Sequence, residues 1–343
     1  MKQQLELPDT LMIERLRDAY GLRVTRLDFL PLGADLNAAV YKAVAEDGSA
    51  YFLKVRRDES NLAGLTIPRY LEDRGYSRAV APLPTKSGRL SAGLSAFTLI
   101  LYPFVTGDLA AQVGMSDRQW IEFGSLVKRL HSSKLPRELS AQLPRERFIP
   151  KYADTVGELA AETHELDRAA PYQRELARFW NGRRREIDEI VLRAHALGRN
   201  LQASAADLVL CHADLHTHNV LIDRDDRLHV VDWDGVMLAP KERDLMFVTS
   251  SDSAAVQQHE TLFFTGYGRA TLDRVALAYY RYEWVVQEIG EYGAAVFRRD
   301  DLKAAAKEAA VHSFLELFEP DGVVEAAYAS SSKLPHSPIE GRG

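Results

Sequence analysis

Cysteine and long apolar runs are scarce in this sequence. The single cysteine, Cys211, cannot form an internal disulfide. The amino-terminal segment MKQQLELPDTLMIERL lacks the apolar stretch of about 7 to 15 residues that marks a secretory signal peptide. No run reaches the roughly 18 consecutive apolar residues of a membrane-spanning helix. These absences argue against a secreted or integral membrane protein, and we expect a cytoplasmic one.

Positive charge is also limited and scattered. The chain has 43 lysines and arginines against 49 aspartates and glutamates, which gives a formal net charge of −6. Its densest basic run, Arg183-Arg184-Arg185, is followed closely by acidic residues, as is typical of a solvated helix face. We therefore expect no nucleic-acid surface and favour a neutral or cationic partner. The 343 residues suffice for one large domain or two ordinary ones, and 46% of them are hydrophobic, enough to form a buried core. The sequence leaves the oligomeric state open.

The amino-terminal third predicts an antiparallel sheet. After a short amphipathic helix around Leu16, the strand-like segments RVTRLDFLPL, AAVYKAVAED and SAYFLKVRR follow one another. The last two are joined at Asp47-Gly48, which is a strong hairpin signal. A helix is predicted over residues 59–74, with a break at Pro68, and LSAFTLILYPFV supplies a further apolar strand.

The patterns become helical beyond Gly107-Asp108, where we expect a hinge. Ser116 and Gln119 predict a capping box, and further helices are expected over residues 172–197, 271–291 and 301–318. The predicted fold is α+β, with two lobes and a ligand cleft. Its parts are an antiparallel-sheet lobe over residues 1–105, a mainly helical lobe over 106–330, and a tail over 331–343 whose IEGR resembles a protease-cleavage linker.

One stretch, VLCHADLHTHNVLIDRDDRLHVVDWDG at residues 209–235, interrupts the helical patterns with short strands and many polar residues. His216 and His218 form an H-x-H pair, which permits a zinc site and a hydrolase. No cysteine cluster or H-E-x-x-H helix supports that interpretation. Surface or packing histidines are the simpler explanation.

A second interpretation uses Asp214, Asn219 and Asp232. An aspartate followed five residues later by an asparagine, in a loop before an apolar strand, has the spacing of the protein-kinase catalytic loop. The hairpin VLIDRDDRLHVV is expected to bring Asn219 and Asp232 together, and their hard oxygen atoms suit Mg²⁺. Each residue alone fits an ordinary turn or strand end. Their joint order predicts phosphoryl transfer, with Asp214 accepting the proton of a substrate hydroxyl.

The segments HADLHTHNVLID, VVDWDG and KERDLMFV resemble the aminoglycoside phosphotransferase family, which has a protein-kinase-like fold. The resemblance spans roughly residues 20 to 320 in element order. APKERDLMF and YYRYEWVVQEIGEYG are most similar to members that act on spectinomycin. Family members commonly carry glycine before the catalytic aspartate and asparagine, where this chain has Ala213 and His218.

The resemblance implies an aminoglycoside O-phosphotransferase that uses ATP and Mg²⁺. Its implied substrate is a small cationic hydroxylated compound, spectinomycin or another aminoglycoside, and its implied role is antibiotic resistance. Rival substrates are choline-like alcohols and homoserine. A nucleotide-binding protein without catalysis and a histidine-based metal hydrolase remain alternatives.

The nucleotide-binding residues are also implied by the resemblance. Lys54 in YFLKV matches the lysine that pairs with the phosphates, and Glu59, with Glu72 as its rival, is expected to orient it. The turn PLGADLN matches the loop over the phosphates, although it lacks G-x-G-x-x-G, and LYPFV matches the hinge that binds adenine. The backbone groups expected to contact the nucleotide are those of Gly33, Asn37, Pro103, Phe104 and Val105.

Acidic residues are expected to bind the cationic substrate. Asp214 would orient its hydroxyl, and Asp234 lies two residues from the expected metal ligand Asp232. Glu283 and Glu288 occur at a spacing that can share one helical face. An ordinary charged surface is the alternative for the two glutamates.

Overall fold

The structure is a computed structural model that describes residues 7–33, 37–57, 61–164, 169–204, 206–249, 254–332 and 334. The chain forms two compact units. The first comprises Met1–Pro144, Leu210–Leu238 and Leu262–Gly268, and the second comprises Arg145–Val209, Ala239–Thr261 and Arg269–Gly343. The first unit thus continues past residue 105 and takes up later segments. The single lobe boundary expected at that position stays a prediction.

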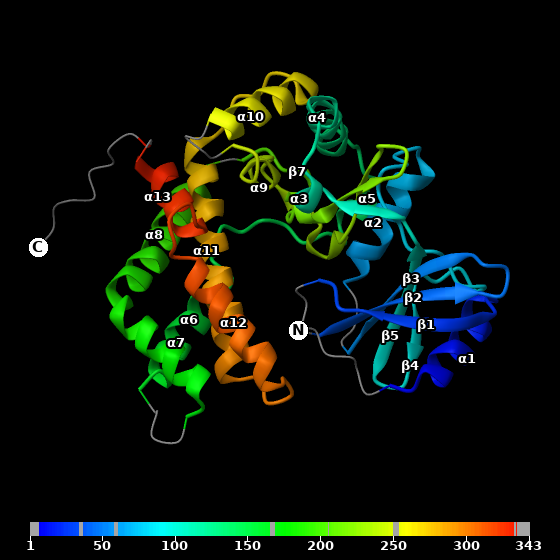
Figure 1. Cartoon of the computed structure of the whole chain (residues 1–343). Coiled ribbons are helices and arrows are strands. Elements are labelled where there is room, and N and C mark those ends of the chain that lie inside the picture. The colour runs from blue at the N-terminus through cyan, green and yellow to red at the C-terminus, as the bar shows by residue number, and fades with distance from the viewer. Residues whose placement is uncertain are drawn as a thin grey trace, which may run out of the picture. The chain divides into compact units, whose positions relative to one another are not determined.

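An antiparallel sheet forms the amino-terminal part of the first unit, as predicted. Its five strands run in the order β1-β2-β3-β5-β4 (Figure 1). Gly48, at φ 83°, turns the chain between β2 and β3. Met12 and Leu16 of the helix α1 share a buried core with the sheet. The elements are α1 (Asp9–Tyr20), β1 (Val24–Leu30), β2 (Ala38–Ala45), β3 (Ala50–Arg56), β4 (Ala92–Leu94) and β5 (Phe97–Pro103).

Helix α2 (Leu62–Asp73) begins at Asn61, whose side-chain oxygen accepts the Ala63 N–H at 3.1 Å. The helix is continuous through Pro68, so the expected break is wrong. A proline removes one backbone hydrogen bond from a helix interior. Burial of the apolar face that includes Pro68 and Leu71 offsets this loss.

The break predicted at Gly107-Asp108 is also wrong, and the hinge expected there stays a prediction. These residues belong to β6 (Gly107–Leu109), which joins β8 (Val220–Asp223) and β9 (Leu228–Val230) in the order β6-β8-β9. A Cβ on Gly107 would lie 2.1 Å from the Ile222 carbonyl oxygen. Glycine is therefore required here by close strand approach rather than by a bend. The short helix α3 (Ala110–Val113) follows, and β7 (Val209–Cys211) pairs with β10 (Met237–Ala239).

Helix α4 (Asp117–His131) starts with the predicted capping box. The Ser116 hydroxyl accepts the Gln119 N–H at 3.4 Å, and the Ser116 N–H donates to Gln119 Oε1 at 2.9 Å. On the buried face of α4, Gly124 lies directly against the backbone of α10 (Ala254–Tyr267), where a Cβ would meet the Phe263 carbonyl oxygen at 1.9 Å. The first unit also contains α5 (Arg137–Ser140).

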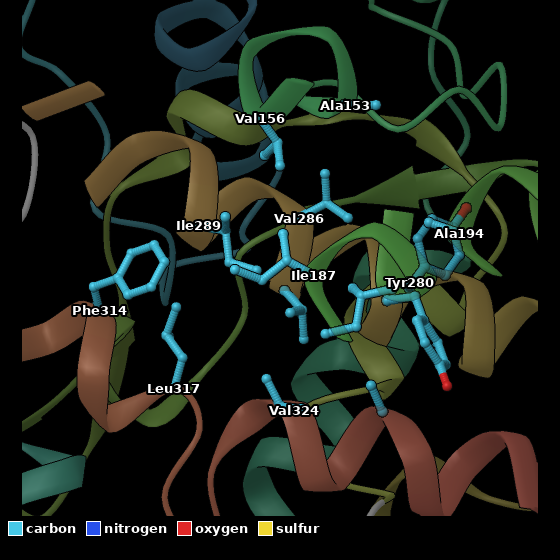
Figure 2. Close-up of a cluster of buried hydrophobic side chains, with 14 of the residues drawn as sticks. Ala153, Val156, Ile187, Ala194, Tyr280, Val286, Ile289, Phe314, Leu317 and Val324 are labelled. Carbon is cyan, nitrogen blue, oxygen red and sulfur yellow. The ribbon is translucent and has the colours of Figure 1, made fainter. Parts of the chain in front are cut away.

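The second unit is helical and packs around α11 (Figure 2). Its hydrophobic core brings Val286 and Ile289 of α11 together with Ile187 of α8 and Phe314 of α12. The helix predicted over 172–197 is divided at Arg183, at φ −111°. The helices are α6 (Ala153–Glu162), α7 (Pro171–Gly182), α8 (Arg184–Gln202), α9 (Glu242–Leu245), α11 (Arg274–Phe297), α12 (Ala304–Glu316) and α13 (Val323–Ser332).

Two further expectations concern the chain's ends and membranes. Helix α13 continues to Ser332, so it includes the first residues of the expected tail. Of the remaining tail, all but residue 334 lies outside the described residues. Within the described ranges, no helix combines the length and apolar character needed to cross a bilayer.

Candidate active site

The polar stretch predicted to carry the chemistry lies in the first unit. Asp214 occupies the loop after β7, and Asn219 ends the 3₁₀ turn η1 (Thr217–Asn219) before β8. Asp232 follows β9 and precedes the turn η2 (Trp233–Gly235). The Val231 N–H donates to the Asn219 carbonyl oxygen at 3.0 Å, so the β8–β9 hairpin brings Asn219 and Asp232 to one end of the paired strands.

Asp214 and Asn219 are held in direct contact. The Asn219 side-chain N–H donates to Asp214 Oδ2 at 2.8 Å and to the Asp214 carbonyl oxygen at 2.7 Å. Because the amide nitrogen is engaged in this way, Asn219 Oδ1 is the atom suited to a metal. The Asp214 side chain is 49% exposed, so a substrate hydroxyl can reach it.

His216 favours the ionised form of Asp214. Its Nε2 lies 3.3 Å from Asp214 Oδ1. Burial acts to raise the pKa of Asp214, but the hydrogen bond and electrostatic interaction with His216, with smaller contributions from His212 and Asn219, outweigh burial and lower that pKa. An ionised carboxylate can orient a hydroxyl and accept its proton.

The same contacts disfavour the H-x-H metal interpretation. His216 Nδ1 accepts the His218 backbone N–H at 3.2 Å, while Nε2 faces Asp214. Both ring nitrogens of His216 are therefore engaged within the loop. The rings of His216 and His218 meet edge to face, with centroids 5.4 Å apart, as packing histidines do.

Two residues around the site have left-handed backbone conformations. Ala213 lies at φ 70° and Asp232 at φ 60°. For a residue with a Cβ this region costs roughly 1–2 kcal/mol. The conformation of Ala213 explains why glycine is common at this position in the family that the sequence resembles. Strain of this kind concentrates at functional sites.

His212 fixes the loop to the strand that carries Asp232. Its Nε2 lies 2.9 Å from the Val231 carbonyl oxygen, which can only accept, so Nε2 donates. The buried imidazole also packs on Trp233, with ring centroids 4.7 Å apart. His212 is absent from the sequence-based predictions, although it opens the motif H-x-D.

Lys54 of β3 reaches both aspartates of the DWD segment. Its Nζ lies 3.1 Å from Asp232 Oδ1 and 2.8 Å from Asp234 Oδ2. Burial acts to lower the pKa of Lys54, but the two carboxylates outweigh it and raise that pKa above its ordinary value. Lys54 is thus a buried cation at the expected metal ligand. Arg56, two residues further along β3, also pairs with Asp234 and was not predicted.

The carboxylates predicted to orient Lys54 are not seen to do so. Glu59 lies outside the described residues. Its rival Glu72 pairs with Arg69 at 2.7 Å, near the carboxyl end of α2. Among the described residues, Asp234 is the carboxylate nearest to Lys54 Nζ.

The expected nucleotide-contacting backbone lies beside three strand ends of the first unit, namely the end of β1, the start of β2 and the end of β5. Gly33, exposed and at φ 81°, follows β1, and the Asn37 carbonyl oxygen at the start of β2 accepts the Arg57 N–H at 3.1 Å. Pro103 ends β5, and Phe104 and Val105 follow it half-exposed.

The two predicted glutamates lie on α11 of the second unit and differ in environment. Glu283 is buried and pairs with Arg243 at 2.7 Å, so its charge is already compensated. Glu288 is half-buried and accepts the Trp284 indole N–H at 3.1 Å. Their role in substrate binding stays a prediction, for which Glu288 is the better suited of the two.

Comparison with known proteins identifies the family. Residues 28–284 match the phosphotransferase enzyme family (APH). The structure of spectinomycin phosphotransferase APH(9)-Ia, in complex with ADP and spectinomycin, is 29% identical, with a TM-score of 0.85 over 95% of this chain and 99% of that one. Protein StrN of Streptomyces griseus is 24% identical over 282 residues, which are 77% of this chain and 82% of StrN.

A more distant structure also confirms the fold. Amicoumacin kinase hAmiN, in complex with AMP-PNP, Ca²⁺ and Ami, is 16% identical, with a TM-score of 0.59 over 93% of this chain and 94% of that one. The expected α+β, protein-kinase-like fold is therefore confirmed. The chain belongs to the phosphotransferase enzyme family, as an aminoglycoside phosphotransferase-type small-molecule kinase.

Proposed function

We propose that the protein transfers the γ-phosphoryl group of ATP to a hydroxyl of spectinomycin and thereby confers resistance. The observation that carries the proposal is the contact of Asp214 with Asn219 beside a hairpin that delivers Asp232 to Lys54. This arrangement supplies a carboxylate for a hydroxyl, hard oxygen ligands for a metal, and a cation for phosphates. The similarity to the spectinomycin phosphotransferase supports the choice of substrate.

In the proposed reaction, Asp214 orients the substrate hydroxyl and accepts its proton. The hydroxyl oxygen forms a bond to the γ-phosphorus as the bond from that phosphorus to the β,γ-bridging oxygen breaks, and ADP leaves. The transition state is loose, so positioning and electrostatic stabilisation carry most of the catalysis. The ionised state of Asp214 suits this role, because a carboxylate that is already protonated cannot accept the proton.

The donor set fits magnesium. Asn219 Oδ1 and the Asp232 carboxylate are hard oxygen ligands, and the Asp232 side chain is 45% exposed, which gives an ion access. Mg²⁺ would supply charge compensation for the phosphates. Lys54 is proposed to bind the phosphates directly, since its buried ammonium lies 3.1 Å from Asp232.

The remaining nucleotide contacts are proposed by position. Backbone groups of Gly33 and Asn37 are assigned to the phosphates, and those of Pro103, Phe104 and Val105 to adenine. Glu59 stays a candidate partner of Lys54. These assignments are tested by nucleotide binding to backbone-altering variants such as Gly33→Pro, compared with Gly88→Pro in a loop with open space around its glycine.

The cationic groups of spectinomycin require acidic partners. Asp234 is already shared by Lys54 and Arg56, and Glu283 by Arg243. Among the predicted acidic residues of α11, Glu288 is half-buried and therefore accessible, whereas Glu283 is buried. We assign the substrate ammonium to Glu288. A rise in the KM for spectinomycin in Glu288→Gln, with an unchanged KM for ATP, is the expected result.

The function is tested by Mg²⁺-dependent ADP release with a substrate panel. Spectinomycin is compared with other aminoglycosides, choline and homoserine. ADP release with another compound, but not with spectinomycin, would support the kinase activity and refute spectinomycin as the substrate. Nucleotide binding without release for any hydroxyl compound would favour a binding protein, and stoichiometric bound zinc would favour the hydrolase.

A further inference from the structure

The active site contains a charge cluster that the catalytic residues alone do not explain. Among the residues that the structure describes, two cations, Lys54 and Arg56, meet two carboxylates, Asp232 and Asp234. Asp234 is the common member, because Lys54 Nζ and Arg56 Nη1 both contact its Oδ2. The side chains of Lys54, Arg56 and Asp234 are only 10%, 13% and 29% exposed. Ion pairs so shielded from water interact much more strongly than surface pairs do.

The backbone holds these groups in place. Lys54 and Arg56 are two residues apart on β3, so their side chains leave the same face of the sheet. Asp234 lies in η2, where the Asn61 side-chain N–H donates to its carbonyl oxygen at 3.0 Å. A Cβ at Gly64 of α2 would lie 3.1 Å from the Asp234 Cα. The amino end of α2 therefore fixes the position of Asp234.

We infer that Asp234 orients Lys54, and that Arg56 holds and neutralises Asp234 so that Lys54 can turn to the phosphates. Both are positioning residues that act through Lys54. The inference rests on the proposed function only in that ATP binds at Lys54. It gives Asp234 a role in nucleotide binding rather than in the predicted binding of the cationic substrate.

The charge balance explains why Arg56 is needed. When ATP enters, Lys54 moves from carboxylate to phosphate, and Asp232 is engaged by the metal. Asp234 then remains as an uncompensated carboxylate beside a polyanion unless Arg56 keeps it neutral. Without Arg56, Asp234 would both retain Lys54 and repel the phosphates, since unscreened like charges disfavour each other. The loss of nucleotide affinity caused by removing Arg56 must therefore depend on the presence of Asp234.

A double-mutant cycle tests this dependence. The Kd of MgADP is measured by calorimetry for the wild type, Arg56→Gln, Asp234→Asn and the double variant. We expect the Kd to rise by about tenfold in Arg56→Gln and by about threefold in Asp234→Asn. In the double variant the Kd should rise by no more than about threefold to fivefold. Arg56→Lys should retain binding within about threefold, because it keeps the charge. The KM for ATP should rise in Arg56→Gln, with a smaller change in kcat.

Controls separate this effect from unfolding and from loss of surface charge. Arg57→Gln changes the neighbouring exposed arginine by the same substitution and should leave the Kd unchanged. Thermal unfolding of each variant is recorded, and Arg56→Lys supplies a folded comparison should Arg56→Gln be unstable.

Three results would overturn the inference. In the first, the Kd of MgADP in the double variant rises by the product of the two single-variant factors. That result would show that Arg56 contacts phosphate independently of Asp234. An unchanged Kd in Arg56→Gln would remove Arg56 from the site, and a wild type that does not bind MgADP would refute the nucleotide site itself. Failure of spectinomycin as substrate leaves the cycle intact, because MgADP binding needs no acceptor.

Discussion

Replacement of Glu283 by glutamine decides between two roles for this residue of α11. The sequence suggests a substrate carboxylate, whereas the structure shows an ion pair with Arg243 at 2.7 Å. Glutamine keeps the side-chain shape and a hydrogen-bond acceptor but removes the charge. The Arg243 guanidinium would then be buried without its counter-ion, and we expect a large loss of stability.

The magnitude follows from burial. The side chains of Arg243 and Glu283 are 14% and 9% exposed. Burial acts to lower the pKa of Arg243, and Glu283 outweighs burial and raises it in the wild type. Without Glu283 the guanidinium still stays charged, because arginine is effectively always protonated in proteins. Removing one partner of a buried pair costs about 3–5 kcal/mol. Because glutamine still accepts a hydrogen bond, we expect a decrease near the lower end, about 3 kcal/mol, in the free energy of unfolding.

Urea-induced unfolding, followed by circular dichroism, measures this change. The matched control is Glu162→Gln, which removes a partner of Arg298 in the same unit, where the two side chains are 38% and 34% exposed. An exposed pair contributes about 0–1 kcal/mol. Replacing Arg243 and Glu283 together by methionine and leucine should recover most of the stability. A Glu283→Gln variant as stable as Glu162→Gln, with a raised KM for spectinomycin, would refute the structural role.

Three other predictions concern the catalytic loop and the packing of the first unit. Asp214→Asn should lower turnover by about 10² to 10⁴ while the Kd of MgADP stays within about twofold; near-normal turnover would refute its role. Asn219→Ala should raise the Mg²⁺ concentration for half-maximal ADP release by at least about tenfold, and an unchanged Mg²⁺ titration would remove it as a ligand. Gly124→Ala should destabilise the protein by about 1–3 kcal/mol or more in urea unfolding, because its Cβ would meet the Phe263 carbonyl oxygen at 1.9 Å. The control Gly157→Ala, with nothing within 4 Å of its Cβ, should be neutral or stabilising, and equal effects at both glycines would contradict the close helix contact.

Local patterns in the sequence predict the elements of the fold well. Segments rich in valine and aromatic residues specify β2 and β3, and the Asp47-Gly48 turn fixes how they pair. The capping box at Ser116 marks the start of α4. These features depend on residues close together in the chain, so their physical causes can be read without tertiary information.

The errors arise where a distant segment decides the outcome. Gly107 looks like a break, but β8 makes it a strand position with no room for a side chain. Pro68 looks like a helix end, but the burial of α2 keeps the helix intact. In both cases tertiary packing overrides a local propensity.

In the candidate site, too, local features can be predicted from the sequence, whereas contacts between distant segments cannot. The order of Asp214, Asn219 and Asp232 suffices to predict that the β8–β9 hairpin brings Asn219 and Asp232 together, because that hairpin is local, and the catalytic role of the three residues stays a prediction. The partners of Lys54 cannot be predicted in this way, since Asp232 and Asp234 lie 178 and 180 residues further along the chain. Arg56 was not predicted for the same reason. Its position two residues after Lys54 does indicate that both side chains lie on the same face of β3.

The central claim is that Asp214 delivers a hydroxyl of spectinomycin to ATP, and one measurement tests it most directly. ADP release from ATP is followed with and without spectinomycin, in Mg²⁺ and in EDTA, for the wild type and Asp214→Asn. We predict release that needs both spectinomycin and Mg²⁺ and that falls by about 10² to 10⁴ in the variant. Release that is independent of spectinomycin, or equal in the two proteins, would contradict the claim.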